Sequence, residues 1–191
     1  GDVFEGLSIW EEEKYQKLQG TYPVISLSFA NIKEVDFETT SYRIRQLLMK
    51  LYEKNKFLKE CKELSKAEKN YFDRMVTEMS EKDAPMAIYQ LSDFLHRYYG
   101  KKAIILLDEY DTPMQEAYVR GYWEELVSFT RSLFNSTFKT NPYMERAIMT
   151  GITRVSKESI FSDLNHLKVV TTTSKEYADS FGFTETEVFE A

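Results

Sequence analysis

Short apolar runs alternate with long amphipathic segments along the chain, and this alternation is the feature that most constrains its fold. The runs cover residues 22–30 (YPVISLSFA), 103–107 (AIILL), 145–154 (ERAIMTGITR) and 167–174 (LKVVTTTS). Their length and their content of branched apolar residues and threonine indicate β-strands. Since strands separated by helices are joined by parallel crossovers, we expect an α/β fold with a mainly parallel sheet and helices on both of its faces.

The segments between the strands carry apolar side chains at the spacings of an amphipathic helix. In residues 36–55 these side chains recur at intervals of three, four and seven. The same pattern occurs in residues 66–80, 85–99 and 114–138, and Gly121 is a candidate interruption of the last segment. We expect the apolar faces of these helices to pack in the core, and nothing in them indicates a cofactor site.

Length and composition favour a single folded domain over residues 1–191. Of the 191 residues, 42% are hydrophobic, which is enough to bury a core. The formal net charge of -6 gives no overall attraction to nucleic acid or to an anionic membrane. No apolar run approaches the roughly 18 residues needed to cross a bilayer, and one cysteine cannot form an internal disulfide. We therefore expect a cytoplasmic protein with no membrane segment.

Three carboxylates follow the apolar run at residues 103–107. Asp108, Glu109 and Asp111 lie within four residues, at the carboxyl end of a strand that we place in the middle of the sheet. Ligands of parallel sheets gather at this end, and clustered like charges are favoured where a cation or a proton transfer uses them. An apolar strand followed by Asp-Glu is the Walker B pattern of nucleotide hydrolases. The alternative is an aspartate that caps the next helix beside solvated charges.

The strand expected at residues 145–154 also ends in side chains that suit a phosphate site. Thr150 and Thr153 stand near its carboxyl end, where a hydroxyl beside a Walker B strand can sense a terminal phosphate by hydrogen bonding. Arg154 adds a charge that is complementary to phosphate. The alternatives are threonines that fill space in the sheet and an arginine in a surface ion pair.

These segments together carry a family resemblance. LLDEYDTPMQEAY (106–118), RAIMTGITRVSKESIFSDLNHLKVV (146–170) and YADSFGFTETEV (177–188) resemble the AAA-ATPase-like family of prokaryotic proteins, as do VFEGLSIW (3–10) and YPVISLSF (22–29). Members of that family typically join a P-loop ATPase domain to a C-terminal nuclease-like domain of the PD-(D/E)XK type. The resemblance covers nearly the whole chain and is least distinctive between residues 36 and 99.

The resemblance implies a P-loop NTPase-like fold of three layers, αβα, and a role for each acidic or polar residue. Asp108 takes the magnesium role, Glu109 the catalytic role, and Thr150 or Thr153 the role of a sensor of the nucleotide. Arg154 matches a family position whose role is less defined. The implied cofactors are ATP and Mg²⁺, and the implied further partner is nucleic acid, bound through the nuclease-like domain.

A Gly-rich phosphate-binding loop is missing from the 191 residues. Only Gly1 and Gly6 have the spacing of GxxxxGK[ST], and Leu7 stands where the lysine is required. We therefore expect residues 1–191 to be a truncated domain that lacks the P-loop and the first strand, and that binds ATP weakly or not at all. In the implied strand order, 5-1-4-3-2, the missing first strand lies between the strands at residues 167–170 and 146–151. Both of these strands would then have an unpaired apolar edge, which favours self-association.

Three functions fit these residues, and the first is the leading hypothesis. It is the Walker B and sensor portion of an ATP-hydrolysing domain that acts as a nucleotide-driven switch in a larger protein. The second is a non-catalytic scaffold derived from an ATPase. The third is a metal-dependent nuclease, which the sequence supports less because DEYD (108–111) supplies no lysine of the (D/E)XK type.

Overall fold

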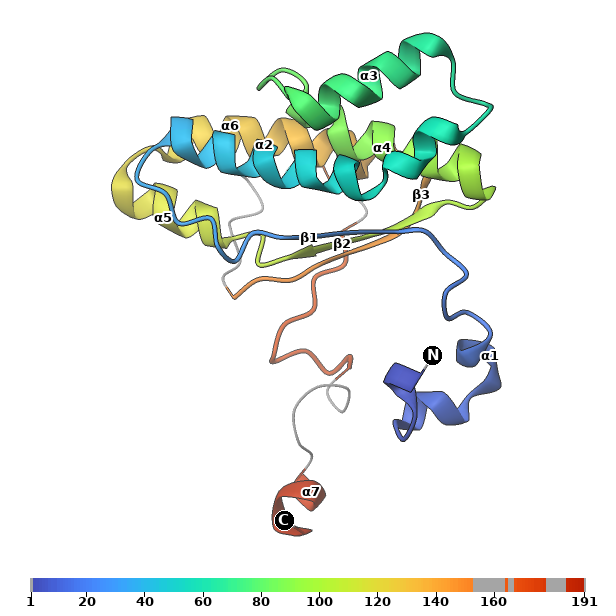
Figure 1. Ribbon diagram of the computed structural model, residues 1–191. Coiled ribbons are helices and arrows are strands. Elements are labelled where there is room, and N and C mark those ends of the chain that lie inside the picture. The colour runs from blue at the N-terminus through green and yellow to red at the C-terminus, as the bar shows by residue number, and fades with distance from the viewer. Residues whose placement is uncertain (1, 153–163, 165–166, 178–184, 191) are drawn as a thin grey trace.

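A layer of helices covers one face of a three-stranded parallel sheet (Figure 1). The computed structural model describes residues 2–152, 164, 167–177 and 185–190. The strands are β1 (Val24–Ser28), β2 (Ala103–Asp108) and β3 (Met144–Met149), in the order β1-β2-β3. The apolar run at residues 103–107 is therefore the central strand, as the sequence predicts.

Five helices of nine residues or more make up the layer above the sheet in the described part of the chain. They are α2 (Phe37–Lys54), α3 (Lys66–Thr77), α4 (Ala84–Tyr99), α5 (Thr112–Arg120) and α6 (Trp123–Phe134). Asp36 caps α2 by accepting a hydrogen bond from the Thr39 backbone N–H at 2.8 Å, and Ser65 and Glu68 form a capping box at the start of α3. Gly121 has φ 87° and ends α5, so the segment at residues 114–138 divides into separate helices.

Shorter elements lie at the ends of the chain and between the helices. They are η1 (Asp2–Phe4), η2 (Ser8–Glu11), α1 (Glu13–Gln16), η3 (Lys56–Glu60), the π-helix η4 (Asn135–Lys139) and α7 (Glu185–Glu190). Figure 1 draws the N-terminal elements and α7 apart from the helical layer, on the other side of the sheet. No helix in the described ranges is both long and apolar enough to span a membrane.

The core lies between the sheet and the helices. Its largest fully buried side chains are aromatic, and Tyr52 of α2 packs against Phe72 of α3 with ring centroids 5.0 Å apart. The Tyr52 hydroxyl donates to the Ala87 carbonyl of α4 at 2.8 Å, and burial raises the pKa of this phenol well above its usual value. One hydroxyl thus joins α2 to α4 inside the core.

The expectation of helices on both sheet faces is wrong for the described residues. The alternate side chains Ile25 and Ile105 face the helices and are buried, whereas Val24 and Ile148 on the other face are 50% and 53% exposed. Figure 1 shows no helix packed on that second face, so the described architecture has two layers rather than three. A continuous apolar run predicts burial on both sides, but it cannot show whether an element lies there to bury it.

The strand expected at residues 167–174 is also absent. Residues 167–171 and 174 have no regular structure, residues 172 and 173 form a turn, and Val169 and Val170 are 46% and 41% exposed. Branched side chains favour an extended backbone, but a strand forms only where a neighbouring strand accepts its hydrogen bonds. The implied strand order places another strand between this segment and β3, and no described segment occupies that position.

Candidate functional site at the carboxyl end of the sheet

Three oxygen-bearing side chains meet where the parallel strands end. Ser28 is the last residue of β1 and lies opposite Asp108, the last residue of β2, while Thr150 directly follows β3. One Asp108 carboxylate oxygen, Oδ1, accepts a hydrogen bond from the Thr150 hydroxyl, and the other, Oδ2, accepts one from the Ser28 hydroxyl at 3.4 Å. Asp108 is exposed, so its carboxylate is oriented from both neighbouring strands and still open to solvent.

Backbone hydrogen bonds continue this arrangement beyond the strands. The Phe29 N–H donates to the Asp108 carbonyl at 2.9 Å, and the Thr150 N–H donates to the Leu107 carbonyl at 2.9 Å. The Tyr110 N–H then donates to the Thr150 carbonyl at 3.1 Å. The residues around Asp108 are therefore placed by the sheet itself and not by a free loop.

Glu109 adopts a backbone conformation that is uncommon for a residue with a side chain. Its φ is 48°, in the left-handed region, where the chain leaves β2 and turns toward α5. Its partly buried side chain accepts a hydrogen bond at Oε2 from the Thr112 hydroxyl at 3.1 Å. Left-handed backbone at a non-glycine residue is found disproportionately at functional sites.

Asp111 differs from the two preceding acids because it is 1% exposed. It occupies the N-cap position of α5, although its side chain forms no capping bond, and its Oδ2 accepts a hydrogen bond from the Gln115 side chain at 3.0 Å. Asp111 therefore has the position of the helix-capping aspartate that the sequence offered as the alternative, although its side chain does not form the capping bond.

Gly151 packs the segment after β3 against the segment after β2. A Cβ atom at this position would lie 2.6 Å from Asp111 Oδ1 and 2.9 Å from Tyr110 Cε1, which is closer than real Cβ contacts. A side chain is therefore excluded unless these groups move. Gly151 directly follows Thr150, so this close approach lies next to the residue whose hydroxyl binds Asp108.

The sequence-predicted residues divide into those that the structure brings together and those that it does not describe. Asp108, Glu109 and Thr150 lie at one edge of the sheet, as the shared carboxyl end of parallel strands predicts. Thr153 and Arg154 lie outside the described residues. Sequence reasoning missed Ser28, although the signal was available, because it ends the strand expected beside the acidic one.

The donors at this edge suit a hard cation. The side chains that bind Asp108 in the described residues are the Ser28 and Thr150 hydroxyls, and the described ranges contain no group of three His, Cys, Asp or Glu side chains that could hold a metal by themselves. Mg²⁺ is commonly bound by one or two carboxylates while waters and substrate phosphates complete its shell. The arrangement therefore fits magnesium held jointly with a phosphate ligand, and it does not fit a closed site of the zinc type.

Comparisons with known proteins agree with the resemblance drawn from the sequence. The family model described as "Predicted AAA-ATPase" (AAA-ATPase-like) matches residues 1–161. A protein of Azotobacter chroococcum mcd 1, named "Uncharacterized protein in vnfD 5'region", is 31% identical over 94 residues. That match covers 49% of this chain and 18% of the relative, so the matched part is a minor part of the relative's length. No solved structure matches the chain.

Proposed function

Because the chain belongs to the AAA-ATPase-like family, we propose that Asp108, Glu109 and Thr150 form the metal-binding, catalytic and sensing part of an ATP hydrolysis site. One observation carries this proposal. The carboxylate that ends the central strand is exposed and accepts a hydrogen bond from the hydroxyl that follows the neighbouring strand. This is the position where parallel sheets bind their ligands.

Asp108 has the task of holding magnesium in this proposal. When bound, the ion neutralises charge on the phosphates during hydrolysis. The Ser28 and Thr150 hydroxyls each donate to one oxygen of the Asp108 carboxylate, so they fix its orientation before a ligand arrives. The Ser28 hydroxyl oxygen also accepts from the Ala30 N–H at 3.4 Å, and each hydroxyl oxygen retains a lone pair that can accept from water.

Glu109 has the task of accepting a proton from the attacking water. Its carboxylate is adjacent to Asp108 in the chain, and its Oε2 is held by the Thr112 hydroxyl. Glu109 polarises the water through an oxygen of this carboxylate, and the bond to Thr112 steadies the side chain until the substrate is present. Thr150 senses the terminal phosphate by redirecting its single hydroxyl proton from Asp108 to a phosphate oxygen, with Thr153 as the alternative sensor, while Arg154 supplies a complementary charge.

The phosphates themselves are bound by residues outside the 191-residue sequence in this proposal. The sequence contains no GxxxxGK[ST] loop, so the carboxylates are present without a backbone cradle for the phosphates. Hydrolysis then works as a switch within a longer protein, and the 191-residue chain alone binds ATP weakly or not at all.

Substitution of Glu109 in the full-length protein tests the proposal. Glu109→Gln is expected to lower the ATP turnover rate by about 10²–10⁴-fold, because it removes the base, while ATP affinity stays within about threefold. Asp108→Asn is expected to remove the magnesium dependence of ATP binding. Glu145→Gln on β3 makes the same change of charge at an exposed position and serves as the matched control.

The same measurements separate the alternatives. Turnover that is equal in Glu109→Gln, Glu145→Gln and the unaltered protein would contradict the assigned catalytic role, and failure of the full-length protein to bind ATP would favour a scaffold derived from an ATPase. Magnesium-dependent cleavage of DNA by the 191-residue chain itself, lost in Asp108→Asn, would favour the nuclease instead.

A further inference from the structure

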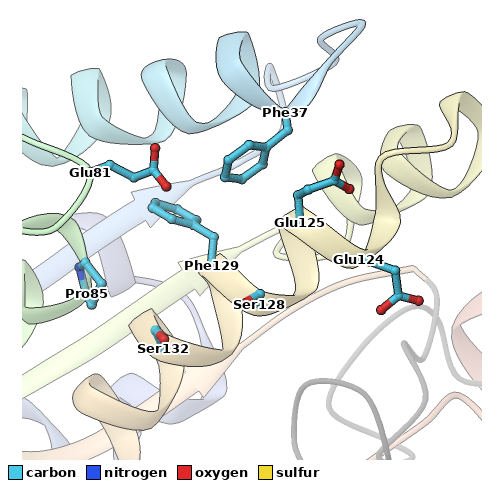
Figure 2. A pocket seen from close by; sticks show the side chains of 8 residues that line it. All are labelled: Phe37, Glu81, Pro85, Glu124, Glu125, Ser128, Phe129 and Ser132. Atoms are coloured by element: carbon cyan, nitrogen blue, oxygen red, sulfur yellow. The ribbon is translucent and has the colours of Figure 1, made fainter.

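An aromatic groove with an acidic rim opens in the helical layer, between α2, α4 and α6. It has a volume of about 550 Å³ (Figure 2). Its floor is formed by Phe37 at the start of α2 and Phe129 of α6, whose ring centroids lie 6.1 Å apart with their planes at 72°. Phe129 is buried, and Phe37 is partly exposed toward the groove. Pro85, in the first turn of α4, adds to the apolar lining.

Carboxylates from two separate elements border this floor. Glu81 comes from the turn before α4, and Glu124 and Glu125 come from the first turn of α6. Figure 2 shows the Glu81 and Glu125 carboxylates on opposite sides of the two rings, with Glu124 turned away from them. The groove lining contains no lysine, arginine or histidine, so nothing in the lining neutralises these charges.

The carboxylates of the rim are also unpaired elsewhere in the described part of the chain. Neither Glu81 nor Glu125 takes part in any of the ion pairs found among those residues. By contrast Asp83, two residues from Glu81, is bound by Arg74 at 2.6 Å. The rim therefore keeps its negative charge available, while a nearby acid is neutralised within the fold.

The helix dipole explains only part of this arrangement. Acidic residues are stabilised in the first turn of a helix, which accounts for Glu124 and Glu125 in α6. It does not account for Glu81, which lies outside any helix, or for an aromatic floor between carboxylates that come from different elements. The groove has the features of a recognition surface that combines ring faces with two negative charges.

We propose that this groove binds an arginine side chain of a protein partner. A guanidinium group stacks on an aromatic ring such as the partly exposed Phe37, is less strongly hydrated than an ammonium, and carries five N–H donors for carboxylates such as Glu81 and Glu125. Charge complementarity selects a basic occupant and disfavours the phosphates of a nucleic acid. The exposed Ser128 and Ser132 are four residues apart on α6 and extend the groove for the backbone of the bound segment.

Short peptides test the proposal by NMR on the ¹⁵N-labelled 191-residue chain. Acetyl-Gly-Arg-Gly-amide is expected to shift the backbone amides of residues 81–84 and 123–132 in a saturable manner. The citrulline peptide, which has nearly the same shape without the charge, is expected to give no saturable shifts there. The lysine peptide is expected to bind roughly threefold or more weakly, because its ammonium is more strongly hydrated and has no planar face to stack on a ring. Equal binding of the arginine and citrulline peptides, or of the arginine and lysine peptides, would overturn the assignment.

Substitutions show whether the groove is the binding site. The double change Glu81→Gln and Glu125→Gln is expected to weaken arginine-peptide binding by roughly fivefold or more. Glu60→Gln with Glu145→Gln removes the same charge from exposed positions elsewhere and is expected to leave affinity within about twofold. Phe37→Leu keeps apolar volume but removes the ring, and it is expected to weaken binding by roughly twofold or more. Equal affinity in the two double variants, or shifts centred outside the groove, would refute the proposal.

Discussion

Gly151 is the position where a single methyl group is expected to disturb the candidate site most directly. In Gly151→Ala the new Cβ would lie 2.6 Å from Asp111 Oδ1 and 2.9 Å from both Asp111 Cγ and Tyr110 Cε1. Ordinary van der Waals contact begins near 3.4 Å, so Asp111 must move by most of an ångström or the segment after β3 must lift. Asp111 is 1% exposed and bound by Gln115, so it has little room to yield.

The expected magnitude follows from this overlap. Forcing one extra carbon into a closely packed site costs about 1–3 kcal/mol, and the fixed partner places Gly151→Ala in the middle of that range, at about 2 kcal/mol. The left-handed region is not involved, because Gly151 has no positive φ. The cost is therefore steric and depends on the Asp111 side chain.

Urea unfolding of four proteins isolates that dependence. The free energy of unfolding is measured for the unaltered chain, Gly151→Ala, Asp111→Ala and the double variant, with circular dichroism as the readout. If the Asp111 carboxylate is the obstacle, Gly151→Ala is expected to cost about 2 kcal/mol in the native background and under about 1 kcal/mol when Asp111 is alanine, with Tyr110 Cε1 causing the remainder. A cost below about 0.5 kcal/mol, or an equal cost in both backgrounds, would refute the steric reasoning.

Two further variants probe contacts that hold the helical layer together. The Arg97 guanidinium at 2.6 Å, together with hydrogen bonds from Ser65, lowers the pKa of Glu68 from 4.5 to about 2. These contacts therefore stabilise the fold above pH 4.5 and lose their effect as the pH falls toward 2. Glu68→Gln is therefore expected to lower the free energy of unfolding by about 1 kcal/mol at pH 7, after allowance for the partial exposure of the pair, and by less than half of that at pH 3. Urea unfolding at both pH values measures this difference. A difference that does not change with pH would contradict the reasoning. Tyr122→Phe removes a hydroxyl that donates to the Glu34 carbonyl at 2.8 Å and accepts from Thr40. It is expected to lower the free energy of unfolding by about 1–2 kcal/mol in the same assay. An unchanged stability would be the contrary result.

The parallel sheet and the meeting of Asp108 with Thr150 could be predicted because both follow from topology. Once apolar runs are assigned to parallel strands separated by helices, their carboxyl ends must share an edge, whatever the details of packing. Ser28 could have been found by the same argument. Serine at the end of an amphipathic strand is chemically ordinary, however, and only the register that pairs it with Asp108 gives it a role.

Other features depend on contacts that no local pattern encodes. The left-handed backbone of Glu109 is set by the turn from β2 into α5, and propensity alone would have assigned such a conformation to glycine. The branched residues at 167–170 favour a strand, but pairing decides whether one forms, and no described strand lies beside them. The helices lie on one face of the sheet although the central run is apolar on both faces. The composition therefore showed that both faces could be buried, but it could not show whether both are.

The run Asp-Glu-Tyr-Asp shows how tertiary contacts assign different roles to acids that look equivalent in sequence. Asp108 is exposed and accepts from a hydroxyl on each side, whereas Asp111 is buried and lies against Gly151. Glu109 falls between them, partly buried and held by Thr112. A charged ligand at this edge can reach the Asp108 carboxylate without disturbing the fold, but it could reach Asp111 only by breaking the packing around Gly151. In the proposed ATP site the exposed Asp108 is therefore the better candidate for the metal-binding role, and the buried Asp111 packs against Gly151, which follows Thr150.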